Sequence, residues 1–323
     1  MIFLIIFSTK LNVLILYLET IRKINNIVNT LISVIIPTFN RASTLKKAIE
    51  SVIKQTYSDW EVILVDNSST DNTLEILEEF NNINIKLLTV NNNGVIGYSR
   101  NVGIEHCSGK YIAFLDSDDW WDCEKLSESV LLLESSNIDV VYHNCQFISD
   151  QSTGDTHCRR LSKEAFSDLI INGNTLVTSS TVVLKSAIVD AGCFSEDKEV
   201  NGWEDYHLWM RLAEANVQFG LIKKSLGFCR KDGDNFDTPQ RVLLNLIEIE
   251  KYIHQNHSSV VQLRHIWWID YARGRAHMRA DYTNNSNKFF LNVVINKSPL
   301  EYKIKALYFL IKLALYRRSQ KKV

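Results

Sequence analysis

Apolar and amphipathic segments alternate along the chain from about residue 31 to residue 150. The apolar segments are short and rich in β-branched residues, as strands buried on both faces are. The segments between them carry apolar residues at helical spacing, so that Leu45, Ala48, Ile49 and Val52 fall on one helical face. The predicted strands are 31–37, 60–66, 83–90, 111–116 and 138–148, and the predicted helices are 41–55, 70–80, 97–107 and 123–136.

This alternation predicts an α/β fold with a mainly parallel sheet flanked by helices. After residue 150 the alternation weakens, although a strand leading into a helix is predicted at 179–188 and a helix at 203–215. The loop at 230–239 contains Gly and several Asp residues and is of the kind that acts as a lid. With 323 residues and 46% hydrophobic content, the chain can form one large domain with an extension.

Polar clusters follow three of the predicted strands directly, at 37–40, 66–67 and 116–118. In parallel α/β sheets, ligands bind beyond the carboxyl ends of the strands. We therefore expect these three clusters to meet in one site at one edge of the sheet.

The third cluster is acidic, because Asp116, Asp118 and Asp119 lie within four positions. Carboxylate oxygens are the ligands that Mg²⁺ and Mn²⁺ prefer, and a bound cation relieves the repulsion between them. The alternative is that Asp118 or Asp119 caps the helix at 123–136. We favour the metal, since a fold gains nothing from crowding like charges at the end of a strand.

The overall composition excludes some classes of protein. The formal net charge is −1, so there is no basic signature of nucleic-acid binding. Six scattered cysteines without a C-x-x-C pair indicate reduced thiols in a cytosolic compartment. The histidines, including His106, His143, His157 and His207, show no metal-ligand spacing and are interpreted as surface or core residues.

The two ends of the chain differ from the rest. Residues 1–30 form an apolar extension without a basic n-region or a small-residue cleavage site, so we do not expect a signal peptide. A single membrane anchor is one interpretation, but Lys10 interrupts the apolar run, and an interfacial or packed helix or a mis-called start is favoured.

At the other end, Leu300, Ile304, Leu307, Tyr308, Ile311 and Leu315 follow helical spacing among lysines and arginines. This helix either packs on the body or lies on anionic lipid, which we favour.

No dinucleotide fingerprint, phosphate-binding P-loop, hydrolase elbow or zinc-protease motif occurs in the chain. Four other segments occur in a fixed order: "SVIIPTFNR", "SVIKQTYSDWEVILVDNSSTDNT", "GYSRNVGIEHCSGKYIAFLDSDD" and "WEDYHLWMRLA". Together, over about residues 31–215, they resemble the family-2 glycosyltransferases of the GT-A fold, and most of all the bacterial enzymes that build surface polysaccharide, such as O-antigen or capsule.

The resemblance implies a domain plan. A GT-A catalytic domain would span 31–240, with a nucleotide-binding half at about 31–120 and an acceptor half at about 121–240. A helical C-terminal region with a basic amphipathic terminal helix would follow at 241–323.

The resemblance also implies residue roles in binding a nucleotide-sugar. Phe39 would stack on uracil, and Asp66 would accept a hydrogen bond from the base. Arg100 would lie near the nucleotide or diphosphate as a positive counter-charge. Asp116 would bind the ribose side. The nucleotide-sugar-binding candidates are Pro37, Thr38, Phe39, Asn40, Arg41, Asp66, Asn67, Arg100, Asp116 and Ser117. Asn67 departs from the second Asp that is commoner in the family, which leaves its share in nucleotide binding open.

Asp118 would ligate a Mn²⁺ or Mg²⁺ ion that bridges the diphosphate, and Asp119 would support the site or face the acceptor. Glu204 and Asp205 would form the acidic catalytic pair, with Asp205 as the general base that takes the proton of the acceptor hydroxyl. Complementation of a helix dipole in the first turn of the 203–215 helix is the alternative for this pair.

Two departures from the family's pattern affect the expected chemistry. The loop after the acidic pair lacks the usual His, so Arg230 or Lys231 is a further candidate for holding phosphate. The Q-x-x-R-W motif of processive synthases is absent, which favours one sugar added per encounter.

The resulting expectation is an inverting, metal-dependent hexosyltransferase that uses a UDP-sugar. Its acceptor would be a lipid-linked oligosaccharide at the cytoplasmic face of the bacterial cytoplasmic membrane, to which the C-terminal helix would bind peripherally. Two alternatives are a sugar-phosphate nucleotidyltransferase, which should show a Gly- and Arg-rich loop after the first strand, and an inactive nucleotide-sugar-binding scaffold.

Overall fold

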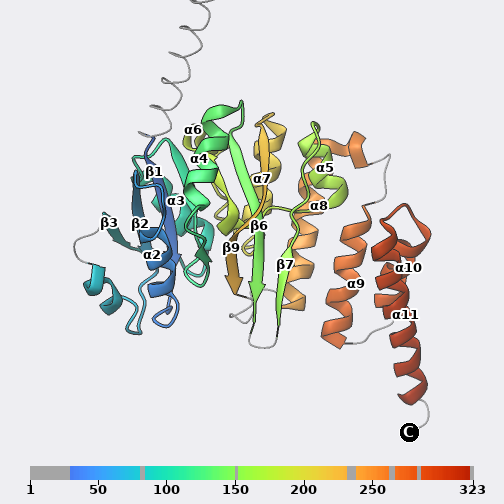
Figure 1. Ribbon diagram of the computed structural model, residues 1–323. Coiled ribbons are helices and arrows are strands. Elements are labelled where there is room, and N and C mark those ends of the chain that lie inside the picture. Colours follow the sequence, from blue (N-terminus) through green and yellow to red (C-terminus); the bar gives the residue numbers. More distant parts are fainter. Residues whose placement is uncertain are drawn as a thin grey trace, which may run out of the picture.

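The computed structural model describes residues 30–80, 84–149, 152–230, 238–261, 266–281 and 285–320. Its strands are β1 (Ile32–Thr38), β2 (Trp60–Asp66), β3 (Ile85–Thr89), β4 (Tyr111–Phe114), β5 (Trp120–Trp121), β6 (Val140–Ile148), β7 (Thr153–Thr156), β8 (Val182–Leu184) and β9 (Phe219–Arg230). The strands form one sheet in the order β3-β2-β1-β4-β8-β6-β9-β5, with β7 paired to β6 (Figure 1).

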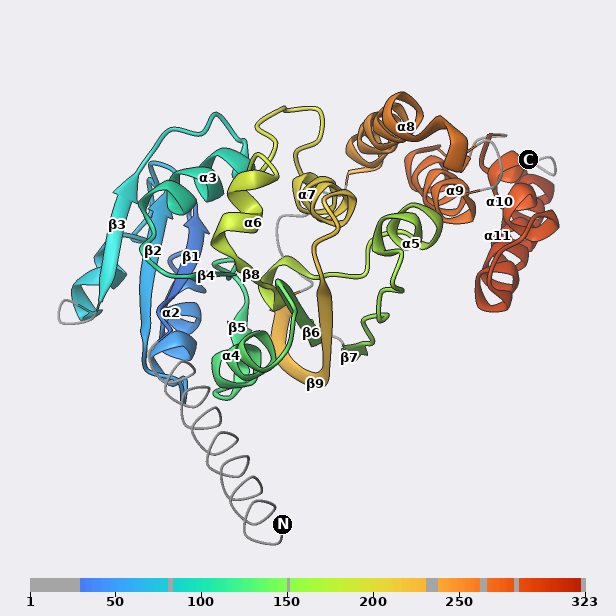
Figure 2. The same cartoon turned by 90° about the horizontal axis from the view of Figure 1, so that it is seen from above.

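Helices cover the sheet on both faces and continue beyond it (Figure 2). They are α2 (Leu45–Ile53), α3 (Ile96–His106), α4 (Lys125–Ser135), α5 (Ala165–Asn172), α6 (Lys185–Asp190), α7 (Glu204–Glu214), α8 (Pro239–Val261), α9 (Trp267–Asp281), α10 (Asn285–Ile295) and α11 (Leu300–Gln320), with 3₁₀ turns η1 (Glu75–Phe80) and η2 (Thr178–Ser180). The predicted α/β fold with flanking helices and a helical C-terminal region is confirmed.

Parallel pairing is confined to two parts of the sheet. Strands β3, β2, β1 and β4 are parallel neighbours, and β6 is parallel to β9. Strand β8 runs antiparallel between β4 and β6, and the short strands β5 and β7 are antiparallel to β9 and β6. The carboxyl ends of β1, β2 and β4 therefore lie at one edge, where the three polar clusters follow them.

Two apolar layers hold the sheet between the helices. On one face, Leu45 and Val52 of α2 and Leu126 and Val130 of α4 pack with the side chains that β1 directs toward that face. On the other face, α3, α5, α6, α7 and α8 contribute to a second core around Trp209. Alternate residues of each buried strand enter opposite cores, which is why these strands are apolar throughout.

A third core joins α9, α10 and α11. Phe290, Val293, Ala306 and Leu313 are fully buried in it. The predicted boundary between residues 240 and 241 falls at the start of α8. No helix in the described part of the chain has both the length and the hydropathy of a membrane span. The expectations for residues 1–30 fall almost entirely outside the described residues.

Some elements differ from the sequence-based predictions. The helix expected at 70–80 begins only at Glu75 and is a 3₁₀ helix, because Asp71 and Thr73 form a local turn in which the Asp71 carboxylate accepts the Thr73 N–H at 3.0 Å. The long strand β9 and the helix α5 were not predicted. Lys223 and Lys224 interrupt the apolar pattern of β9, where a shift in the β6–β9 register gives the strand an irregular step.

Candidate functional site

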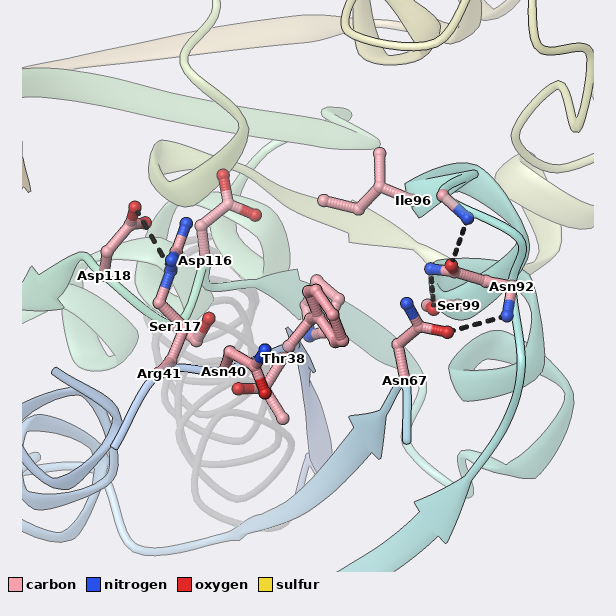
Figure 3. Close-up of a pocket in the computed structure, with 13 residues that line it drawn as sticks. Thr38, Asn40, Arg41, Asn67, Asn92, Ile96, Ser99, Asp116, Ser117 and Asp118 are labelled. Atoms are coloured by element: carbon pink, nitrogen blue, oxygen red, sulfur yellow. Dashed lines mark hydrogen bonds and ion pairs between the residues drawn. The ribbon is translucent and has the colours of Figure 1, made fainter. Parts of the chain in front are cut away.

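A cavity of about 560 Å³ opens at the edge where β1, β2 and β4 end (Figure 3). Thirteen residues line it: Pro37, Thr38, Phe39, Asn40, Arg41, Asn67, Asn92, Gly94, Ile96, Ser99, Asp116, Ser117 and Asp118. The structure therefore brings together all three polar clusters that follow the predicted strands.

The turn after β1 gives the cavity an aromatic wall. Phe39 is 50% exposed, which is unusual for a large apolar ring and leaves its face available to a ligand. Asn40 follows in the left-handed region at φ 50°, and its side-chain oxygen accepts the Thr70 N–H at 2.8 Å. The Asn40 N–H donates to Ser69 Oγ at 2.9 Å. These two bonds fix the turn and with it the position of Phe39.

Asp66 and Asn67 occupy different places at the end of β2. Asp66 is fully buried, and its carboxylate accepts both the N–H and the hydroxyl of Ser69. It is not among the residues that line the cavity, and its contact with the base stays a prediction. Asn67 does line the cavity, and its Oδ1 accepts the Asn92 N–H at 2.7 Å. Because that backbone donor fixes the orientation of the amide, Asn67 offers its nitrogen as the remaining polar group.

The segment between β3 and α3 adds residues that sequence reasoning missed. Asn92 donates to Ser99 Oγ at 2.9 Å and accepts the Gly94 N–H at 2.8 Å, which closes the turn beside the cavity. Asn93 and Gly94 both have positive φ, which Asn and Gly tolerate best. The "NNNG" stretch after a predicted strand was the available signal, since it ends at the same edge of the sheet.

The acidic cluster after β4 divides into distinct roles. Asp116 and Asp118 line the cavity with side chains that are 31% and 26% exposed. Burial and the neighbouring Asp116 raise the pKa of Asp118, against the opposing effect of Arg41, whose Nε lies 3.9 Å from the carboxylate. Asp119 is buried instead. Its carboxylate accepts the Ser179 hydroxyl at 2.6 Å and the Arg230 N–H at 3.0 Å, which joins this loop to β9.

The alternative that the cluster caps a helix is not supported. Helix α4 starts at Lys125, and the Asp122 carboxylate accepts the Glu124 N–H at 2.9 Å near its first turn. Asp118 and Asp119 lie before that turn and are bound elsewhere. Helix capping therefore does not account for the acidic cluster.

The fit to a divalent cation rests on Asp118 with Asp116 beside it. No group of three or more His, Cys, Asp or Glu residues that could hold an ion occurs among the described residues. A Mg²⁺ ion usually takes only one or two protein carboxylates and completes its shell with substrate phosphate and water. A desolvated carboxylate with a like-charged neighbour suits such a cation, so the donor set fits a metal that binds together with a diphosphate.

Arg100 lies behind the cavity and not in its lining. The residue is 2% exposed, and its Nη2 donates to Asp116 Oδ1 at 2.8 Å. Its Nη1 donates to Glu204 Oε1. Burial alone would lower the pKa of the guanidinium, but Asp116 and Glu204 together raise it. Arg100 therefore links the acidic cluster to α7, and its predicted role as a counter-charge near the nucleotide or diphosphate stays a prediction.

Glu204 and Asp205 open helix α7 in different environments. Glu204 is buried, and its second oxygen accepts the Gly202 N–H. Asp205 is partly buried, and its oxygens accept the Thr178 hydroxyl at 2.8 Å and the Tyr206 N–H at 2.6 Å. Burial and the neighbouring Glu204 raise the pKa of Asp205 to about 7. A carboxyl group with a pKa near 7 can exchange protons near neutral pH. Both donors to Asp205 are neutral, whereas Glu204 is more deeply buried and pairs with the charged Arg100.

Arg230 borders a smaller cavity of about 200 Å³ that shares Asp118 with the first. Lys47 and Trp120 also line it, and the Lys47 ammonium lies 3.1 Å from the centre of the Trp120 ring. Two cations beside the candidate metal ligand would favour phosphate. Lys231 and most of the predicted lid at 230–239 lie outside the described residues.

The sequence of the chain is similar to those of known glycosyltransferases. The model of the family "Glycosyl transferase family 2" matches residues 33–190. A UDP-Glc:alpha-D-GlcNAc-diphosphoundecaprenol beta-1,3-glucosyltransferase of Escherichia coli, WfgD, is 33% identical over 186 residues, which cover 58% of this chain and 71% of that protein. An uncharacterized glycosyltransferase of Rickettsia bellii is 31% identical, but the match covers 70% of this chain and only 32% of that longer protein.

Solved structures agree on the fold. Residues 1–349 of TarS from Staphylococcus aureus superpose with a TM-score of 0.57 at 21% identity, over 87% of this chain and 80% of that one. The mannosyltransferase PcManGT from Pyrobaculum calidifontis, solved with GDP-Man and Mn²⁺, gives a TM-score of 0.56 at 15% identity, over 90% of this chain and 82% of that one.

Proposed function

The chain belongs to glycosyltransferase family 2, and we propose that it moves one hexose from a UDP-sugar to a lipid-linked saccharide. The observation that carries this proposal is the connection from the cavity to α7. Asp116 and Asp118 line the cavity, and Arg100 joins Asp116 to Glu204, beside Asp205. The cavity and a candidate base are thereby connected through one buried guanidinium.

The donor would bind with its base against Phe39 and Asn67. An exposed aromatic ring provides a stacking surface, and the Asn67 amide nitrogen can donate to a base carbonyl oxygen. The diphosphate would then lie toward Asp118, near Arg41 and Arg230. A bound Mn²⁺ or Mg²⁺ would neutralise the negative charge that develops on the leaving diphosphate.

In the transfer step, the acceptor hydroxyl oxygen forms a bond to the anomeric carbon of the sugar. The bond from that carbon to the diphosphate oxygen breaks, and the nucleoside diphosphate leaves. The hydroxyl proton passes to the Asp205 carboxylate, whose raised pKa suits that exchange at neutral pH. Attack opposite the leaving group inverts the anomeric centre, so an α-linked donor gives a β-glycoside.

Glu204 acts as a positioning residue in this proposal, since it is buried and its ion pair with Arg100 keeps it ionised and fixed in place. For the acceptor, the name of WfgD points to a sugar carried on diphosphoundecaprenol in that relative. We extend the same class of acceptor to this chain and place the reaction at the cytoplasmic face of the bacterial cytoplasmic membrane. The absence of the Q-x-x-R-W motif of processive synthases favours one sugar added per encounter.

Calorimetric titration of UDP into the full chain, first with Mn²⁺ and then with EDTA, tests this proposal. We expect binding that depends on the metal, followed by UDP release from a UDP-sugar when a GlcNAc-diphospholipid acceptor is added. Metal-dependent UDP binding without any turnover on a panel of UDP-sugars would instead support the scaffold alternative. Absence of UDP binding under both conditions would contradict the proposed donor.

A further inference from the structure

Helix α11 has two apolar faces, and only one of them is buried. Ala306, Phe309 and Leu313 pack into the third core against α9 and α10. The opposite side, here called the outer face of α11, consists of six large apolar side chains that are 45% to 73% exposed: Leu300, Ile304, Leu307, Tyr308, Ile311 and Leu315. In the described part of the chain, no side chain shields this face. Ile295, at the end of the preceding helix α10, is 71% exposed as well.

Apolar surface gathered along one helix calls for an explanation, because isolated exposed side chains are common but contiguous patches mark interaction sites. Packing cannot account for it, since α11 is already anchored through its other side. The same six residues follow helical spacing in the sequence, so the exposed face extends along most of the helix.

The outer face is flanked by positive charge. Residues 285–323 contain nine Lys or Arg and a single acid, Glu301, which leaves 27 basic and 36 acidic residues for positions 1–284. Lys305 and Lys312 are exposed on α11, and Glu301 pairs with Lys305. The end of the chain is thus strongly basic, whereas the rest of the protein is acidic.

We propose that the outer face of α11 docks on an anionic lipid surface, with its apolar side chains in the interface and its lysines at the headgroups. An amphipathic helix with cations beside its apolar side binds such surfaces by both effects. Two copies of the chain meeting through this face would bring their basic segments together, and the repulsion disfavours that contact. The acidic remainder of the protein would be repelled by the lipid, so the charge distribution also orients the docked molecule.

Packed aromatic side chains connect the buried side of α11 to the candidate base. Phe309 of α11 lies 6.4 Å, between ring centres, from Tyr271 of α9. Trp268, also on α9, lies 6.1 Å from Trp203 and 5.7 Å from Tyr206, on either side of the acidic pair. Figure 1 shows that α11 runs toward the same side of the molecule as the carboxyl ends of β6 and β9. If the acceptor is lipid-linked, as proposed above, docking would hold α7 at a fixed height over the membrane.

Lysine footprinting on vesicles tests the docking directly. The full chain is labelled with an amine-reactive ester, with and without vesicles of phosphatidylcholine alone or with phosphatidylglycerol, and each lysine is quantified by mass spectrometry. We expect labelling of Lys305 and Lys312 to fall severalfold with anionic vesicles at low salt and to recover at high salt. Lys54 and Lys224, exposed on the sheet-containing part, should keep their labelling. This measurement reports on α11 itself, whatever residues 1–29 contribute to binding.

The double variant Ile304→Glu/Ile311→Glu removes two exposed side chains from the face without disturbing a core. The vesicle concentration that protects Lys305 and Lys312 should rise at least about tenfold. Each isoleucine side chain gains free energy on burial in the lipid interface, and the glutamate that replaces it carries a negative charge. The matched control is Leu131→Glu/Val189→Glu, which places the same charges at exposed apolar positions on α4 and α6. Its protection should equal that of the unmodified chain.

Two results would overturn the inference. One is equal labelling of Lys305 and Lys312 with and without anionic vesicles. The other is protection without vesicles that disappears on dilution together with a dimer seen by light scattering, which would identify a second copy as the occupant. UDP titration on the same samples separates this outcome from failure of the proposed function, because donor binding does not require lipid.

Discussion

Arg100 and Glu204 form a buried ion pair between side chains that lie 104 positions apart in the sequence. The guanidinium is only 3% exposed and the Glu204 carboxylate only 6%. The same guanidinium binds Asp116 at 2.8 Å, so one cation holds the acidic cluster of β4 and the acidic pair of α7 together. The position of the candidate base Asp205 relative to the cavity therefore depends on Arg100.

Replacing Arg100 with Gln should destabilise the protein by about 3 to 5 kcal/mol, because two carboxylates lose a buried partner. Chemical denaturation followed by circular dichroism measures the free energy of unfolding. The matched control is Arg273→Gln, whose pair with Glu250 is more exposed and should contribute about 1 kcal/mol or less. Equal losses for the two variants would contradict the bridging role of Arg100.

Replacing Asp205 with Asn should lower kcat by roughly 10² to 10⁴-fold, since the acceptor hydroxyl loses its proton acceptor. UDP affinity should change less than about twofold, because Asp205 does not line the donor cavity. Release of UDP and calorimetry measure the two quantities. The control Asp190→Asn alters an exposed carboxylate at the end of α6 and should leave both unchanged. Near-normal turnover by Asp205→Asn would exclude it as the base.

The raised pKa of Asp205 also predicts how rate and stability vary with pH. Only the ionised carboxylate accepts a proton, so kcat/KM should rise with pH and level off above an apparent pKa of about 7. The folded state retains the proton up to about pH 7, whereas the unfolded chain loses it near the ordinary value of 3.8. The contribution of Asp205 to stability is thus fully present below pH 3.8 and is lost as the pH rises toward 7.

Asp205→Asn should therefore unfold at higher denaturant concentration than the unmodified chain at pH 8, and the difference should shrink toward pH 4. Denaturation at the two pH values measures it. A variant that is less stable than the parent at pH 8 would show that hydrogen bonds to the carboxylate outweigh its burial.

Replacing Asp118 with Asn should weaken UDP binding at least about tenfold with Mn²⁺ present, because the candidate metal loses its charged ligand. With EDTA the variant and the parent should bind UDP equally, since the Asp118 carboxylate contributes to UDP affinity only through the metal ion. Calorimetry under both conditions separates these effects. Asp155→Asn, at an exposed position on β7, serves as the control. If UDP binding by the Asp118 variant depended on Mn²⁺ as strongly as it does in the parent, Asp118 would not be the metal ligand.

Replacing Phe39 with Ala should weaken UDP binding by about 1 to 3 kcal/mol, the range measured for stacking of a base on an aromatic side chain. Phe39→Tyr keeps the ring and should retain the affinity. Because Phe39 is half exposed, neither change should lower the unfolding free energy by much. An unchanged affinity for UDP in Phe39→Ala, measured by calorimetry, would place the base away from this ring.

The sequence by itself determined the elements and the edge of the sheet at which the site forms. Strands buried on both faces must be apolar throughout, so 31–37, 60–66 and 111–116 could be recognised locally, and parallel topology places their polar ends together. The presence of Phe39, Asn67 and Asp118 in the cavity followed from that rule.

Only the tertiary structure decided which polar side chains face the cavity and which form the hydrogen bonds and ion pairs that fix the surrounding loops. Asp66 and Asp119 have the same chemistry as Asp118, but they are buried and accept hydrogen bonds from the Ser69 and Ser179 hydroxyls. Arg100 was expected near the nucleotide or diphosphate, and only the structure shows that it pairs with Glu204, because long-range packing brings α3 and α7 together. Such partners are far apart in the chain, and no local pattern of residues specifies which of several carboxylates a buried cation will meet.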